Sequence, residues 1–267
     1  MTSIRSHGDH TRLRQMEQLA SRRDRTARRL ASGKRLAGAA DDPAGLAIAT
    51  RLAAGERSAA QGGRNLADGQ GLVRTAEASL QSSQDALGRM RELSVQAQNG
   101  TLSTDDRQTI QQEFDQLAAQ LDQTAAGAQF AGRPLMDGSM SGGQAAVVTD
   151  GAGGDHAVDV PDLRAAALGV AGLAVDAPGT LAAIDGASAR VGEVRATLGA
   201  ADHTLERHGR QLGAAGEALE AARSRIEDVD VAQAVAEQVR DRILLGLQVS
   251  GQRVAGSAPR RLLDLMG

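Results

Sequence analysis

The sequence is poor in the residues that usually stabilise a compact secreted domain. It has no cysteine, tryptophan or tyrosine, and its only aromatic residues are Phe114 and Phe130. A secreted chain without disulfides must be stabilised by packing or by assembly, and a thick core normally relies on aromatic side chains for buried area. Hydrophobic residues still make up 41% of the chain, mostly Ala, Leu, Val and Ile. This composition favours a thin helical assembly over a globule.

Long apolar runs are also missing. No stretch of about 18 apolar residues is present, so we expect no transmembrane helix. The basic N-terminus, MTSIRSHGDHTRLRQ, is not followed by an apolar run or a small-residue cleavage site. We therefore expect no classical secretory signal. If the protein is extracellular, it leaves the cell by another route.

The sequence contains no pattern typical of an enzyme or a metal centre. HExxH, GxSxG and P-loop motifs are all absent. The histidines are His7, His10, His156, His203 and His208. His203 and His208 are five residues apart, which places them on diverging helix faces, and we interpret His208 as a packed polar residue. We expect no catalytic, cofactor or metal site.

A first long helix is predicted from Pro43 to about residue 98. Asp42 provides a helix cap, and the proline after it suits the first helical position. Apolar residues recur every seven residues along this helix, at Leu66, Val73, Leu80 and Leu87. The positions three residues further on are mostly small, which allows a second helix to approach closely. At 1.5 Å per residue, such a helix would span roughly 80 Å.

A second long helix is predicted over 181–226. Its apolar residues have the same spacing of seven without a break, at Ile184, Val191, Leu198, Leu205, Leu212, Leu219 and Ile226. Such an unbroken repeat specifies a coiled-coil helix. Its natural partner is the helix 43–98, because that segment has the same period.

Shorter elements connect these two helices. Asn99-Gly100 ends the first one, and Ser103 caps a helix over 104–126 that lies antiparallel to it. Residues 145–150 and 156–161 flank a glycine-rich turn and predict a β-hairpin region at about 140–165. The alanine-rich segment after Arg164 is expected to add one helical turn.

Helices are also predicted near both termini, over 11–35 and over 229–256, the latter ending before Pro259. The predicted fold is therefore mainly α. It is an elongated rod of long antiparallel coiled-coil helices, with a small β-hairpin region in the middle of the chain and both termini at one pole. This topology is typical of a filament subunit.

Several segments resemble one family, the bacterial flagellins. SGKRLAGAADDPAGLAIATRL (32–52) is similar to the flagellin N-terminal signature, and MRELSVQAQNGTLSTDDRQTIQQEFDQL (90–117) extends the resemblance. QFAGRPLMDG (129–138), VDVPDLRAAALGV (158–170) and ARSRIEDVDVAQAVAE (222–237) follow in the order and spacing of the family. Together these segments cover most of the chain, which looks like a short flagellin without outer variable domains.

The resemblance implies a structural subunit that polymerises into the flagellar filament for motility, and not an enzyme. Residues 1–42 and 227–267 would pair into the inner tube of the filament, and residues 43–226 would form the surrounding layer. Flagellins are secreted through the flagellar type III export channel, without a cleaved signal peptide. The implied partners are other copies of the chain, an export chaperone and hook-associated proteins, with no nucleic acid and no membrane span.

The resemblance also implies one recognition surface. In flagellins similar to this one, a helix with an RxRELxxQ motif is read by a vertebrate innate receptor and is buried when the filament assembles. The matching positions are Arg89, Arg91, Glu92, Leu93 and Gln96, together with Glu113 on the adjacent helix. Arg89, Leu93 and Gln96 lie about one helical turn apart, so we expect them to share a helix face. Packing against neighbouring subunits is the alternative interpretation of the same face.

The termini depart from the family pattern. Seven arginines occupy a segment that should pack tightly in an inner tube: Arg12, Arg14, Arg22, Arg23, Arg25, Arg28 and Arg29. The segment is interpreted as a basic, solvated or channel-facing helix, although a basic arm for nucleic acid or an acidic membrane is an alternative. Two other functions also remain open, a hook–filament junction protein and a secreted flagellin-like binding module that does not polymerise.

Overall fold

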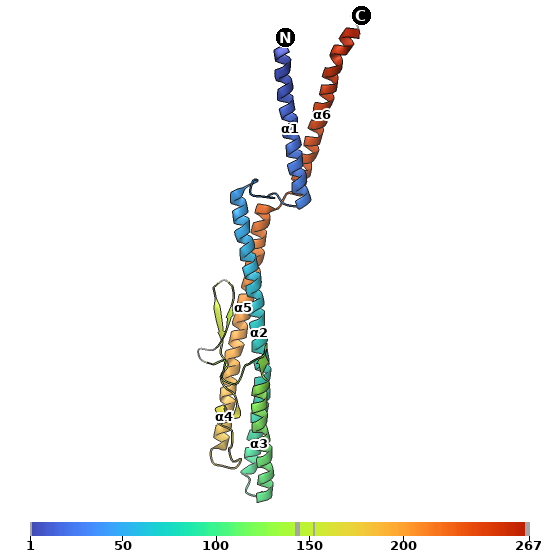
Figure 1. Ribbon diagram of the computed structural model, residues 1–267. Coiled ribbons are helices and arrows are strands. Elements are labelled where there is room, and N and C mark those ends of the chain that lie inside the picture. The colour runs from blue at the N-terminus through green and yellow to red at the C-terminus, as the bar shows by residue number, and fades with distance from the viewer. Residues whose placement is uncertain (1, 142–144, 152, 265–267) are drawn as a thin grey trace. The chain divides into compact units, whose positions relative to one another are not determined.

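The computed structural model describes residues 2–141, 145–151 and 153–264. Its helices are α1 (Thr2–Ser32), α2 (Pro43–Ala97), α3 (Thr104–Gly127), α4 (Ala165–Leu168), α5 (Thr180–Glu227) and α6 (Val231–Asp264). Its strands are β1 (Gln129–Phe130), β2 (Arg133–Pro134), β3 (Ala146–Thr149) and β4 (Asp155–Val158). The mainly helical class, with a small antiparallel strand region in the middle of the chain, is confirmed (Figure 1).

The described chain forms two compact units. Residues 1–55 and 218–267 form a terminal unit, and residues 56–217 form a central unit. Both α2 and α5 cross from one unit into the other. The boundaries predicted at 42/43 and 226/227 lie within about a dozen residues of these divisions and remain predictions about the assembled filament.

In the central unit α2 and α5 pack side by side and antiparallel, as the two repeats predict (Figure 1). A methyl group built on Gly62 would lie 3.0 Å from Leu212 Cδ1, and one on Gly69 would lie 3.3 Å from Leu205 Cδ1. Seven residues forward on α2 thus correspond to seven residues backward on α5. Leucines of α5 fill the space that glycines of α2 leave open, which is how small seam residues bring two helices together.

The predicted seam residues form much of the core of the central unit. Those that are almost fully buried are Leu66, Val73, Leu80, Leu87, Ile184, Val191, Leu198 and Leu205. Leu212, Leu219 and Ile226 are only half-buried. Each fully buried Leu or Ile contributes about 1.5–3 kcal/mol of hydrophobic free energy, so the buried seam provides a large share of the stability of this unit.

The predicted cap of α3 is present as a reciprocal capping box. The Asp106 backbone N–H donates to Ser103 Oγ at 3.2 Å, and the Ser103 backbone N–H donates to Asp106 Oδ2 at 3.1 Å. The Ser103 hydroxyl and backbone N–H both bind the Asp106 carboxylate, and they hold its pKa below the usual value. α3 then buries Phe114 completely in the core that it shares with α2 and α5.

The predicted β-hairpin is confirmed, with β3 and β4 antiparallel and Thr149 paired with Asp155 at the turn. α4 is the short helical turn expected after Arg164. A second, smaller hairpin, in which β1 pairs with β2, was not predicted. Two-residue strands have no periodicity to detect, so only the Ala-Gly turn at 131–132, where both residues have positive φ, hints at it.

In the terminal unit α1 and α6 pack against each other. The linker after α1 pairs with the end of α5, where the Arg35 backbone N–H donates to the Glu227 carbonyl at 2.6 Å. Two predicted bounds were wrong. α1 begins at Thr2 instead of residue 11, and α6 continues past Pro259 to Asp264. The end before Pro259 was expected because proline lacks a backbone N–H and its ring clashes with the preceding helical turn, yet α6 includes this proline.

Candidate functional site

The face predicted from the flagellin motif is built around Arg89 of α2. Its Nε donates to Glu113 Oε1 of α3 at 2.8 Å, and its Nη1 lies 3.0 Å from Glu92 Oε2, one turn further along α2. The hydrogen bond that Arg89 donates to Glu113, followed by the one that it donates to Glu92, raises the pKa of Arg89. All three side chains are exposed to a large degree, so this network is a charged surface feature and not a core element.

The other residues of the motif separate in space. Arg91 leaves this network and pairs with Asp185 of α5, with Nε to Oδ1 at 2.8 Å. Gln96 is exposed, whereas Leu93 is only 1% exposed and belongs to the core. Leu93 is therefore not accessible in the single chain, and the shared recognition face of Arg89, Leu93 and Gln96 stays a prediction. Leu93 stands three residues after the buried Met90, and this spacing places it on the core face of α2.

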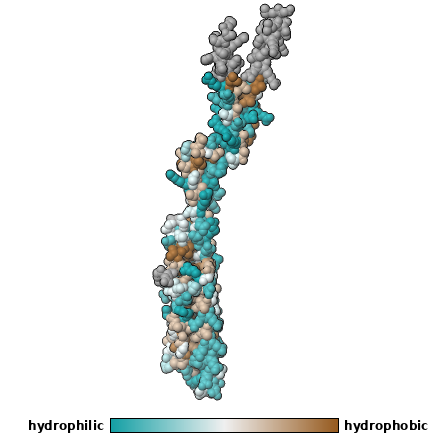
Figure 2. Space-filling view, viewed as in Figure 1, coloured by the Kyte–Doolittle hydropathy of each residue, from teal (hydrophilic) through white to brown (hydrophobic). Residues whose placement is uncertain are grey.

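α6 presents an apolar stripe whose side chains are about half exposed in the single chain. Its members recur every four residues and are between 44% and 63% exposed: Val231, Val235, Val239, Ile243 and Leu247. The opposite face of α6 buries Ala234 and Asp241. Figure 2 shows apolar residues on the surface of the terminal unit among hydrophilic ones. Apolar side chains in a row on a solvent-facing helix are typical of a protein–protein contact.

The arginine-rich segment of α1 is solvated where its side chains are described. Arg22, Arg23, Arg25 and Arg28 are all exposed. Buried positions on this helix are Leu19 and Thr26, seven residues apart. Over its described side chains, α1 therefore packs through one narrow face and leaves these four arginines in solvent in the single chain. Arg12 lies outside the residues whose side chains are described.

One cluster was not predicted from the sequence. Asp150, His156 and His208 each direct a possible ligand atom into a common space, and these atoms all lie within 4.8 Å of one another. No sequence pattern indicates this cluster, because Asp150 follows β3, His156 lies in β4 and His208 lies in α5. Asp150 and His156 come together only because β4 pairs with β3 in this register.

Comparisons with known proteins identify the family of this chain. A family model described as the bacterial flagellin N-terminal helical region matches residues 10–141, and the model of the flagellin C-terminal helical region matches residues 181–265. The chain belongs to the flagellin family. The β3–β4 hairpin of this flagellin chain falls in the interval between the two matched regions. Flagellins are structural proteins and not a known enzyme family.

Similar proteins include flagellar filament proteins of Treponema and flagellins of Vibrio. The flagellar filament 33 kDa core protein of Treponema phagedenis is 33% identical over 257 residues, which is 89% of this flagellin chain and 90% of that protein. Flagellin FlaB1 of Treponema pallidum is 40% identical over 113 residues, but that match spans only 42% of this chain and 40% of FlaB1. The family resemblance therefore extends over nearly the whole length of the former and less than half of the latter.

Solved structures agree on the fold. Bacillus cereus flagellin superposes with a TM-score of 0.50 and 26% identity, over 56% of this chain and 88% of that chain. A flagellar hook-associated protein described as putative, from Vibrio parahaemolyticus, gives a TM-score of 0.50 at 16% identity, over 71% of this chain and 97% of that chain. The second likeness concerns the fold alone.

No described helix is both long enough and apolar enough to cross a membrane.

Proposed function

We propose that this chain is a structural subunit that polymerises into the bacterial flagellar filament. The observation that carries the proposal is the pair of flagellin family matches, in the correct order and over most of the chain. A filament core protein that aligns over 90% of its length supports it. The long α2–α5 seam would provide the stiff element, and the terminal helices would provide contacts between subunits.

The apolar stripe of α6 gives assembly a physical reason. In the single chain these side chains face solvent, at a cost of about 25 cal/mol for each Å² of apolar surface. Residues 227–267 would bury the stripe against other copies in the inner tube, together with residues 1–42. The central segment 43–226 would then form the surrounding layer, as the flagellin resemblance implies.

Electron microscopy of the purified chain tests this proposal. The chain would be seeded with short filament fragments in ammonium sulfate, and the products would be imaged and sedimented. We expect ordered filaments of uniform diameter. A chain that remains monomeric under all seeding conditions would overturn the filament proposal and favour a flagellin-like module that does not polymerise.

Export and accessory partners belong to the same proposal. The chain would leave the cell through the flagellar type III channel, in complex with an export chaperone before export, and would join hook-associated proteins at the filament ends. A deletion strain complemented with the chain should release it into the medium with its N-terminal sequence intact. Its retention in the cell, or its cleavage near the N-terminus, would contradict this route.

The Arg89 face is proposed as a surface for a vertebrate innate receptor and for subunit packing. Arg89, Glu92, Gln96 and Glu113 are accessible to different degrees, whereas Arg91 pairs with Asp185 of α5. Arg89→Ala should lower signalling by receptor-bearing reporter cells at least tenfold when monomer is applied. Arg74→Ala, an exposed arginine on the same helix, is the control. Equal signalling by both variants would exclude the receptor role.

A further inference from the structure

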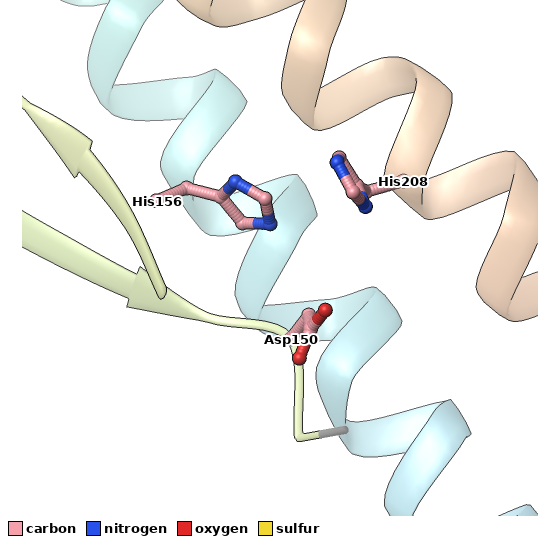
Figure 3. A group of neighbouring side chains, drawn as sticks. All are labelled: Asp150, His156 and His208. Carbon is pink, nitrogen blue, oxygen red and sulfur yellow. The ribbon is translucent and has the colours of Figure 1, made fainter. Parts of the chain in front are cut away.

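Two imidazoles and a carboxylate meet between the hairpin and α5 in the central unit. Figure 3 shows His156 of β4 and His208 of α5 turned toward each other, with the Asp150 carboxylate beside them. The ring centroids of the two histidines are 4.3 Å apart. One ligand atom from each of the three residues lies within 4.8 Å of the other two. The closeness of three metal-binding side chains from separate elements needs an explanation.

The burial of these groups makes simple packing a poor explanation. Asp150 is only 7% exposed, and both histidines are half-buried. His156 Nε2 is buried and has no hydrogen-bond partner among the described residues. A buried polar nitrogen without a partner costs about 1–3 kcal/mol. A bound ion in the common space would supply the missing interaction.

We propose that Asp150, His156 and His208 bind one zinc ion. Zinc takes histidine nitrogens and carboxylate oxygens at about 2.0–2.2 Å in tetrahedral geometry, and it accepts three protein ligands with a water in the fourth position. Two imidazoles disfavour calcium and magnesium, which bind through oxygen atoms. Tetrahedral ligands lie roughly 3.3 Å apart at these bond lengths, so small side-chain rotations would close the present set.

The backbone already holds the carboxylate in place. Asp150 Oδ1 accepts a hydrogen bond from the Gly154 N–H at 2.8 Å, and the Asp150 N–H donates to the Gly154 carbonyl at 2.9 Å. A Cβ on Gly154 would lie 2.4 Å from Asp150 Oδ2, so only glycine leaves room for the carboxylate to fold back over the turn. The Asp150 carboxylate is therefore oriented before an ion binds, as hydrogen bonds from outer groups orient metal ligands in other sites.

The same end of the hairpin is fastened to α2. Ser58 Oγ donates to the Gly151 carbonyl at 2.6 Å, and Asn65 Nδ2 donates to the Thr149 carbonyl at 3.1 Å. These bonds attach the hairpin to one of the two long helices, whereas His208 belongs to the other. A zinc ion would therefore tie the hairpin to α5 and fasten all three elements together. The ion would act as a structural clamp and not as a catalyst.

Zinc uptake by the full-length monomer tests the proposal independently of polymerisation. His7 and His10 would first be replaced by Gln, so that the N-terminal histidines cannot contribute. The chain would be stripped with a chelator, titrated with zinc chloride by calorimetry, and analysed for metal after dialysis. We expect one zinc per chain in this background. Absence of stoichiometric uptake would overturn the proposal.

Matched variants locate the site. His208→Gln and Asp150→Asn should each lower zinc affinity at least tenfold, whereas His203→Gln, on the same helix but 83% exposed at its side chain, should leave it unchanged. Zinc should also slow amide hydrogen exchange in β3 and β4, and His208→Gln should abolish that slowing. Far-UV circular dichroism would confirm that each variant is folded. The assignment is wrong if His203→Gln weakens zinc binding as much as His208→Gln does. It is also wrong if zinc does not change amide hydrogen exchange in the hairpin.

Discussion

Gly62 lies where α2 approaches both the hairpin turn and α5. A Cβ at this position would lie 1.7 Å from the Asp150 carbonyl oxygen, which is a backbone atom and cannot rotate away. We therefore expect Gly62→Ala to shift the hairpin and to destabilise the chain by about 1–3 kcal/mol. Urea unfolding followed by circular dichroism would measure the change.

Gly63→Ala is the matched control for this prediction. It lies on the same helix, and no atom lies within 4 Å of its Cβ position. Alanine is up to about 1 kcal/mol more favourable than glycine inside a helix, so this variant should be as stable as the parent or more so. Destabilisation of both variants to the same extent would show that the close approach to Asp150 does not matter.

Phe114 is the one aromatic side chain that the described core buries completely. Phe114→Ala would leave a cavity among α2, α3 and α5, and we expect a loss of about 3–5 kcal/mol. Phe130 is only half-buried beside Gly71, so Phe130→Ala should cost clearly less. Thermal unfolding of both variants would compare them. Equal losses would mean that the core tolerates repacking around position 114.

At the scale of elements, Glu227 joins the end of α5 to the linker that follows α1. Lys34 forms a hydrogen-bonded ion pair with its carboxylate, and Arg223 Nη1 lies 3.1 Å from Oε2. These partners, Lys34 first, lower the pKa of Glu227 below its ordinary value of 4.5. A lowered carboxyl pKa gives stability that is complete above the ordinary value and is lost as pH falls through the folded-state value.

Glu227→Gln should therefore destabilise the terminal unit at pH 7, by roughly 0.5–1 kcal/mol for a partly exposed pair. The difference from the parent should shrink as the pH falls below 4.5 and through the lowered folded-state pKa of Glu227, because the parent carboxylate then becomes protonated as well. Thermal unfolding at pH 7 and pH 3 measures this. Glu220→Gln, at an exposed position on the same helix, is the control and should leave the stability unchanged at both pH values. A gap that persists unchanged at pH 3 would contradict the role of the ion pair.

The long helices could be predicted because their signal is local and repeated. Apolar residues spaced by seven lie on one helix face, so the repeats that contain Leu66 and Leu198 were enough to predict α2 and α5. The Ser103 cap is equally local. The burial of Leu93 could not be predicted from the motif alone, because its spacing suits both the face of Arg89 and the core face of Met90. The Asp150 cluster depends on hairpin register and helix pairing together, which no local pattern contains.

At the scale of the whole molecule, assembly should depend on the apolar stripe of α6. Val239→Asp places a charge at the middle of that stripe, and burying an unpaired carboxylate between subunits costs far more than burying valine gains. Because Val239 is 52% exposed in the single chain, the variant monomer should remain folded. We expect filament formation in seeded sedimentation assays to fall at least tenfold. Val147→Asp, an equally drastic change at an exposed residue of β3, should still assemble. Normal filaments from Val239→Asp would show that α6 faces solvent in the filament, and contacts between subunits would then have to be sought on α1 or on the Arg89 face.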